Sequence, residues 1–164
     1  MSNYSDTIYA LSTPQGKSAI ALIRVSGKKA LKVIKKITKI KKIIPNKTNL
    51  LFLRNKDVII DQSLLIYFKS PNSFTGEDVM EIYCHGGFAV IDKISKTLEN
   101  NGVRLAEPGE FTKRALLNDK IDLVKTESIS DMINAETEEQ RVLAIKNLSG
   151  GLGEFTKKIN QKIS

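Results

Sequence analysis

The hydrophobic positions in the first two thirds of the chain gather mostly in short segments that predict β-strands. Five segments are rich in the β-branched and aliphatic residues that favour a pleated surface, at positions 7–11, 19–25, 50–53, 58–68 and 79–84. A sixth, shorter strand is expected at 103–106. Turn-forming residues separate these segments, notably at positions 13–16 and 70–73.

Two stretches between the predicted strands change to the helical period. After Lys28 the apolar residues fall at helical spacing and the lysines lie largely on the opposite side, which predicts an amphipathic surface helix ended by Pro45. Its apolar members are Ala30, Val33, Ile34, Ile37 and Ile40. A second helix is expected to follow Gly86-Gly87 and to run toward Glu99, where residues 100–102 cap it.

Only helices are predicted after Pro108-Gly109. They are expected at 110–117, from Asp119 onward, and after Thr137, which forms a capping-box spacing with Gln140. We therefore expect a mixed α/β domain at 1–118 and the start of an all-α domain at 119–164. Apolar residues keep helical spacing to the end of the chain, so we expect an N-terminal fragment of a longer protein. They are Leu148, Leu152, Phe155, Ile159 and Ile163.

The composition, 41% hydrophobic and 27% charged, is that of a globular chain. Its longest apolar runs are about five residues, against the roughly twenty that a membrane span needs. The N-terminus has no secretion or import signal, so we expect a cytoplasmic protein without a membrane partner. The single cysteine, Cys84, excludes an internal disulfide and a cysteine-based zinc site, and it is expected to be a small buried strand residue.

The net charge of +8 is concentrated early in the chain, where ten cations and no acid lie between Arg24 and Lys47. This run fits the phosphate-facing surface of a stand-alone RNA-binding module, or the solvated face of a helix in a lysine-rich chain. No aromatic residue interleaves the lysines of the predicted helix to stack unpaired bases. We therefore expect weak, non-specific RNA binding by this helix.

Two short patterns suggest chemistry but do not complete a motif. Gly16-Lys17-Ser18 has the ending of a P-loop, yet Leu11 occupies the position of the first glycine and a strand is predicted to follow. A turn is the favoured interpretation. His85, the only histidine, could serve as a base near neutral pH, but a structural or turn role is favoured because no triad-like neighbour is evident.

Glu81 is the most informative carboxylate. Strand alternation places it on the same face as Val79 and Tyr83, and we expect this face to point toward the interior. An inward carboxylate needs a partner, and its two oxygens suit a ligand that presents two adjacent N–H donors. A salt-bridged strand residue at a sheet edge remains the alternative.

Three long segments resemble the N-terminal part of the MnmE (TrmE) family of tRNA modification GTPases. They are DTIYALSTPQGKSAIALIRVSG, NSFTGEDVMEIYCHGG and PGEFTKRALLNDKIDLVKTESISDMINAETEEQ, in this order. The resemblance covers essentially the whole chain. It implies a folate-binding, dimer-forming α/β domain similar to tetrahydrofolate-binding aminomethyltransferases, followed by the first helices of an all-α domain into which a GTPase domain is inserted.

The resemblance also implies the site residues and the cofactor. The folate-contacting positions of the family fall on Arg24, Glu81 and Lys120. A reduced folate such as 5-formyltetrahydrofolate presents a ring N–H beside an amino group, which matches the two oxygens of Glu81. Arg24 and Lys120 suit its carbonyl or carboxylate oxygens. The turn at Gln15-Gly16-Lys17-Ser18 departs from the small, glycine-rich turn usual in the family.

The family acts with a flavin-dependent partner, MnmG (GidA), to install an aminomethyl or carboxymethylaminomethyl group at carbon 5 of the wobble uridine (U34) of certain tRNAs. The resemblance implies tRNA as substrate and a homodimer. GTP, Mg and K are expected only in the absent GTPase domain, so no catalytic or metal-binding residue is expected here and this fragment should not hydrolyse GTP. An aminomethyltransferase-like folate protein shares the fold and remains an alternative, as does the RNA-binding module.

Overall fold

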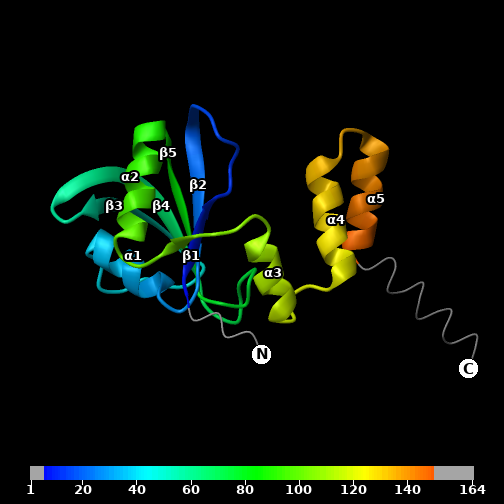
Figure 1. Cartoon of the computed structure of the whole chain (residues 1–164), viewed down its shortest axis with the longest axis horizontal. Coiled ribbons are helices and arrows are strands. Elements are labelled where there is room, and N and C mark those ends of the chain that lie inside the picture. Colours follow the sequence, from blue (N-terminus) through cyan, green and yellow to red (C-terminus); the bar gives the residue numbers. More distant parts are fainter. Residues whose placement is uncertain (1–5, 150–164) are drawn as a thin grey trace, which may run out of the picture. The chain divides into compact units, whose positions relative to one another are not determined.

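The computed structural model of the chain describes residues 6–149 (Figure 1). In chain order the elements are β1 (Ile8–Leu11), β2 (Ser18–Ser26), α1 (Ala30–Thr38), β3 (Thr48–Asn55), β4 (Val58–Phe68), β5 (Val79–Gly86), α2 (Phe88–Glu99), β6 (Arg104–Leu105), α3 (Glu110–Leu117), α4 (Leu123–Asn134) and α5 (Glu138–Leu148). The chain divides into two compact units, Met1–Arg114 and Ala115–Ser164. The predicted mixed α/β class is confirmed.

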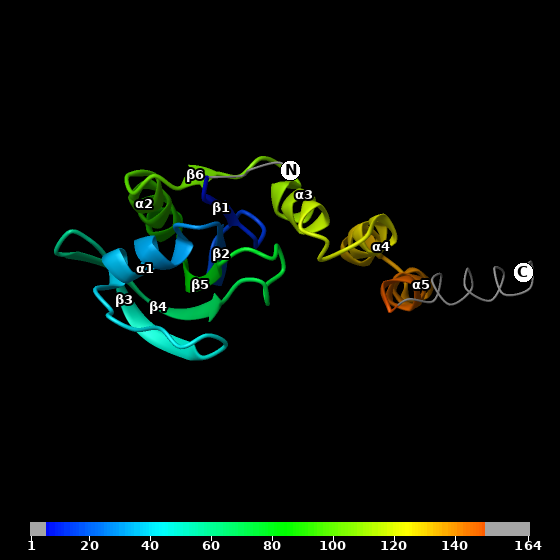
Figure 2. The same ribbon diagram turned by 90° about the horizontal axis from the view of Figure 1, so that it is seen from below.

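All six strands belong to one sheet in the first unit, in the order β3-β4-β5-β2-β1-β6. Neighbouring strands are antiparallel except for β1 and β6, which pair in parallel. Helices α1 and α2 lie together on one face of this sheet (Figure 2). The sheet therefore has one face covered by helices and one face that neither of these helices covers.

Strand alternation explains which residues enter the core. Every second residue of β2 and β5 points toward the helices and is almost fully buried. These residues are Ala21, Ile23 and Val25 in β2, and Met80, Ile82 and Cys84 in β5. The apolar stripe of α1, including Val33, Ile34 and Ile37, completes the same cluster.

The opposite face of the sheet carries a more varied set of residues. Leu50 of β3 lies opposite Leu64 of β4, which lies opposite Tyr83 of β5. Leu50, Leu64 and Phe52 are 59%, 42% and 43% exposed, respectively. Large apolar side chains thus lie exposed next to one another on the uncovered face of β3 and β4. A contiguous exposed apolar patch of this kind is typical of an interaction surface.

Two helix boundaries differ from the sequence prediction. Helix α1 ends at Thr38, well before Pro45, because Lys39 takes a left-handed conformation (φ 57°) that cannot continue a helix. Helix α4 begins at Leu123 and not at Asp119, because Asp122 is its N-cap and accepts a hydrogen bond from the backbone N–H of Lys125 at 2.7 Å.

The second unit contains α4 and α5, which pack against each other. The predicted capping box is confirmed at the start of α5, where the side chains of Thr137 and Gln140 each accept from the other's backbone N–H. Leu148 ends this helix. The predicted helical positions Leu152, Phe155, Ile159 and Ile163 lie outside the described residues. No helix in the described part of the chain is long and apolar enough to cross a bilayer.

Candidate functional site

Arg24 and Glu81, two of the three predicted folate contacts, meet on the face of the sheet opposite α1 and α2. The antiparallel register of β2 and β5 places these residues directly opposite one another. The Nε of Arg24 donates a hydrogen bond to Oε1 of Glu81 at 2.8 Å. Glu81 shares its face with Val79 and Tyr83 as alternation predicts, but that face is not the helix-covered interior. The expectation that it points into the core is therefore wrong.

A third side chain fixes the carboxylate of Glu81. The hydroxyl of Tyr83 donates to its Oε2 at 2.6 Å. This hydrogen bond, together with burial and the negative charge of Glu81, raises the pKa of Tyr83, so the phenol stays protonated near neutral pH. Glu81 thus has one oxygen oriented by a guanidinium and the other by a phenol, and 12% of its side chain is exposed.

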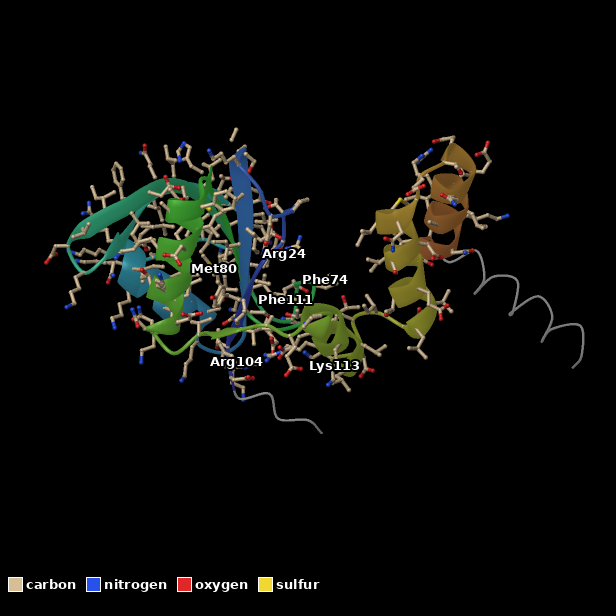
Figure 3. All side chains as sticks on the ribbon, turned by 45° about the horizontal axis from the view of Figure 1, so that its top comes forward. Arg24, Phe74, Met80, Arg104, Phe111 and Lys113 are labelled. Atoms are coloured by element: carbon tan, nitrogen blue, oxygen red, sulfur yellow. The ribbon has the colours of Figure 1, made fainter. Side chains whose placement is uncertain are left out.

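A small cavity of about 120 Å³ opens beside this pair. Its other lining residues are mainly aromatic, namely Phe68, Phe74, Val79 and Phe111. Figure 3 shows Arg24, Phe74 and Phe111 gathered beside β2, although they come from a strand, a loop and a helix. The cavity therefore combines a charged hydrogen-bonding end with aromatic walls.

The loop between β4 and β5, which carries Phe74, is held by hydrogen bonds at both of its ends. The hydroxyls of Ser26 and Thr75 lie 2.8 Å apart, and Ser26 Oγ also donates to Oε2 of Glu77 at 2.6 Å. At the other end of the loop, Asp78 accepts hydrogen bonds from the hydroxyl of Tyr67 and the backbone N–H of Ser70. The residues that flank Phe74 are thus anchored to strands β2 and β4.

A charged network holds the start of α3, and with it Phe111. The fully buried guanidinium of Arg114 donates to Asp6, Glu77 and Glu110 at distances of 2.8–3.2 Å. Arg104 donates to Asp6 and Glu110 as well. Burial by itself would raise the pKa of Glu110, but hydrogen bonds from Arg104, the backbone N–H of Glu107 and Arg114 outweigh it and lower this pKa to about 2. Glu110 is therefore ionised throughout the physiological range.

The lining of the cavity suits a flat ring that carries N–H donors on its edge, which is the chemistry of the predicted pterin. Each carboxylate oxygen can accept two hydrogen bonds, so each oxygen of Glu81 has one further site for a ligand N–H. The two terminal nitrogens of Arg24 make no hydrogen bond with any described residue, which leaves donors for a carbonyl or carboxylate oxygen. Aromatic side chains at the wall suit the face of a flat ring. At about 120 Å³ the cavity has room for a ring system and not for an entire folate.

Lys120, the third predicted contact, belongs to the second unit. It lies in the segment between α3 and α4, is exposed, and its backbone N–H donates to the carbonyl of Ala115 at 2.9 Å. The site described above is made of first-unit residues only. The contact between Lys120 and folate therefore stays a prediction.

Other candidate residues have structural roles. Cys84 is buried in β5 as predicted, and burial raises its pKa to about 11. His85 has a neighbour that sequence reasoning did not identify, since its Nδ1 lies 2.7 Å from Oδ1 of Asp61 and its backbone N–H donates to Oδ2. The GKS segment leads into β2, as predicted, and not into the helix of a P-loop. Among residues 6–149, no cluster of His, Cys, Asp and Glu has the makings of a metal site.

The aromatic walls were not foreseen from the sequence. Phe74 and Phe111 lie within the segments NSFTGED and PGEFTKR that carry the family resemblance, and this was the available signal. Phe68 ends a predicted strand and Tyr83 alternates with Glu81. None of these positions has a hydrophobic pattern that distinguishes a ligand-facing aromatic residue from an ordinary core residue.

Comparisons with known proteins agree with the resemblance. Residues 7–120 match the family model of the GTP-binding protein TrmE N-terminus. The chain is 51% identical over 158 residues to a tRNA modification GTPase MnmE of Fervidobacterium nodosum, with 90% of this chain and 33% of the relative covered. It is 48% identical to the MnmE of Mannheimia succiniciproducens (96% and 34% covered) and 41% identical to that of Thermotoga maritima (96% and 35% covered).

The chain thus spans about one third of the length of these curated relatives. The family model matches more than half of the chain and includes both Arg24 and Glu81. The chain belongs to the MnmE (TrmE) family of tRNA modification GTPases and corresponds to the N-terminal part of its members.

Proposed function

We propose that this chain is the part of a tRNA modification GTPase that binds a reduced folate and forms a homodimer. The observation that carries the proposal is the Arg24–Glu81 pair, which borders an aromatic cavity and retains unused donors and acceptors. Glu81 reads the N–H edge of the pterin, and Arg24 and Lys120 bind oxygens of the folate. When bound, the folate supplies a one-carbon unit.

The residues around Glu81 suit this role because they orient its carboxylate without saturating it. Arg24 and Tyr83 each occupy one site on the carboxylate and leave the others open. Phe68, Phe74 and Phe111 exclude water from the flat face of the ring. A carboxylate with this surrounding discriminates against ligands that lack the paired donors, because such ligands would cover its remaining acceptor sites without filling them.

Calorimetric titration with 5-formyltetrahydrofolate tests the proposal. Glu81→Gln replaces one acceptor oxygen by an amide N–H that faces the donor edge of the pterin, and we expect binding to weaken by about 1–3 kcal/mol. Glu99→Gln makes the same charge change in α2 and should bind like the wild type, because Glu99 pairs with Tyr9 away from the cavity. Equal affinities of the wild type and Glu81→Gln would reject the assignment.

The homodimer is supported by the exposed apolar residues on the uncovered sheet face. Leu50, Phe52 and Leu64 project from neighbouring strands on the same face as Arg24 and Glu81. A second copy that covered this face would remove these side chains from water, which favours association.

The remaining functions belong to the whole protein. With its flavin-dependent partner MnmG (GidA), it would install the aminomethyl or carboxymethylaminomethyl group at carbon 5 of U34 in certain tRNAs in the cytoplasm. GTP, Mg and K would bind in the GTPase domain, while this chain supplies the folate site and the dimer. The chain alone should therefore bind folate and not hydrolyse GTP, which a phosphate-release assay on the purified chain would check.

A further inference from the structure

A second, larger cavity lies away from the folate site, where the C-terminal ends of α1 and α2 meet the β3–β4 hairpin. Its volume is about 570 Å³. Four of its lining residues are cations, namely Lys36, Lys39, Arg54 and Lys56. The first two come from α1 and its end, and the other two come from the hairpin. Folding thus brings together like charges from two separate elements.

The single carboxylate among the lining residues does not balance these charges. Asp57 pairs with Lys39 at 2.7 Å and its side chain is 93% exposed. Lys36 and Lys56 have no carboxylate within 4 Å among the described residues. A group of four cations around one acid repels itself in the free protein, and a bound anion would relieve that repulsion.

Two of the cations have their positions defined by the backbone and by an aromatic ring. Lys56 takes a left-handed conformation (φ 55°) at the tip of the hairpin. The guanidinium of Arg54 lies 5.8 Å from the ring centroid of Phe52, a distance at which a cation–π interaction orients it. This ordering reduces the entropy that Arg54 would lose on binding a ligand.

Neutral donors complete the lining. The side-chain amides of Asn55 and Asn100 make no hydrogen bond with any described residue and are available to a ligand. The carbonyls at the end of α2 would repel an anion, but those of Leu98 and Glu99 already accept from the backbone N–H groups of residues 101–103. A tetrahedral anion with several acceptor oxygens suits this set of donors.

We propose that this cavity binds a phosphate group of the RNA backbone and that the RNA is tRNA. The choice of RNA rests on the proposed function in tRNA modification and on the charge of the site. No aromatic side chain lines the cavity, so it would contact the backbone without reading bases. By this inference, only the basic residues at the C-terminal end of α1 and in the hairpin contact RNA. Lys28, which precedes α1, and Lys32, near its start, are exposed to solvent.

Fluorescence anisotropy with a transcribed tRNA that has uridine at the wobble position tests the proposal on the whole chain. Each lysine that contacts a phosphate contributes about 0.7–0.9 to the slope of log affinity against log salt. Lys36→Ala/Lys56→Ala should therefore lower that slope by roughly 1.5 between about 50 and 200 mM salt. The matched control Lys28→Ala/Lys32→Ala removes the same charge from exposed positions outside the cavity and should leave the slope nearly unchanged.

A variant with the opposite effect guards against loss of folding as the explanation. Asp57→Asn removes the carboxylate that competes with phosphate for Lys39, and we expect tRNA affinity to rise about two- to fivefold. Undetectable tRNA binding by the wild type, equal slopes for the two lysine pairs, or no gain in Asp57→Asn would each overturn the inference. Folate titration of the same variants tests the proposed function separately, because none of these residues lines the folate cavity.

Discussion

Arg24 and Glu81 are 57 positions apart in the sequence, yet the register of β2 and β5 places them face to face with a 2.8 Å hydrogen bond between Nε and Oε1. Only one of the three guanidinium nitrogens is used in this contact. Arg24 can therefore orient the carboxylate and still offer two nitrogens to a ligand. The guanidinium can thus take part in ligand binding as well as neutralise the charge of Glu81.

Arg24→Lys should weaken folate binding even though it keeps the positive charge. An ammonium can satisfy Glu81 or the ligand oxygens, but it lacks the planar fork that reaches both. We expect calorimetry to show a loss of about tenfold in affinity for 5-formyltetrahydrofolate, or about 1.4 kcal/mol. Lys29→Arg is a matched control of the same class on an exposed position, and it should leave the affinity unchanged. Wild-type affinity in Arg24→Lys would show that the fork is not needed.

Phe74→Leu tests the aromatic wall of the proposed folate cavity. Leucine keeps an apolar side chain of similar size but removes the ring face, which is worth about 0.5–1.5 kcal/mol in aromatic pairs. Because Phe74 is 39% exposed, the free energy of unfolding should change little while the folate affinity falls. Phe88→Leu, at the exposed start of α2, should alter neither quantity. An unchanged affinity in Phe74→Leu would place the ring outside the binding site.

Phe52→Lys/Leu64→Lys tests the uncovered sheet face as the dimer interface. Two charges on adjacent strands would have to be desolvated in a dimer that buries this face, so the dimer should dissociate. Sedimentation equilibrium at micromolar concentration should give twice the 18.2 kDa chain mass for the wild type and a monomer for the variant. Ile44→Lys, an exposed apolar residue before β3, should remain dimeric. A monomeric wild type with and without folate would contradict the proposal.

The strands were predictable because turn residues bound segments rich in β-branched and aliphatic residues, and β4 and α3 have the predicted bounds. Strand alternation placed Glu81 beside Val79 and Tyr83, but it could not say which face of the sheet the helices cover. The covered face is determined by tertiary packing, in which the apolar residues of α1 and α2 contact one side of the sheet. A residue on the uncovered face can still be nearly buried when a loop and a helix reach over it, as Phe74 and Phe111 do at Glu81.

The two cavities could not be predicted from spacing alone. The lysines of α1 were evident in the sequence, but their convergence with Arg54 and Lys56 depends on where the β3–β4 hairpin ends relative to the helix. Helix α1 also ends at Thr38 because the backbone of Lys39 is left-handed, and the spacing of hydrophobic residues carries no signal for that conformation. Local pattern therefore predicted the elements, and tertiary contacts decided which side chains share a site.

The charged network under α3 should make stability depend on acid pH. Hydrogen bonds from Arg104 and Arg114 lower the pKa of Asp6. The pKa of Glu110 is lowered from 4.5 to about 2, because its hydrogen bonds outweigh the effect of burial. A carboxyl group whose pKa is depressed in the folded state contributes its full stabilisation at pH values above its unfolded-state pKa. That contribution is lost as the pH falls through the folded-state pKa. We therefore expect urea unfolding to show full stability above about pH 5 and a progressive loss between about pH 4.5 and 2.

Glu110→Gln should remove much of this pH dependence, because an amide does not titrate and cannot form the charge-assisted bonds to Arg104 and Arg114. At pH 7 we expect the free energy of unfolding to fall by about 2–3 kcal/mol, and not by more, because Arg114 keeps Asp6 and Glu77 as partners. Near pH 2.5 most of the difference between the variant and the wild type should have disappeared. Glu138→Gln is the control, since its pair with Arg141 is exposed and contributes little at any pH. A constant difference between Glu110→Gln and the wild type from pH 7 to 2.5 would show that packing, and not the ionised carboxylate, accounts for the loss.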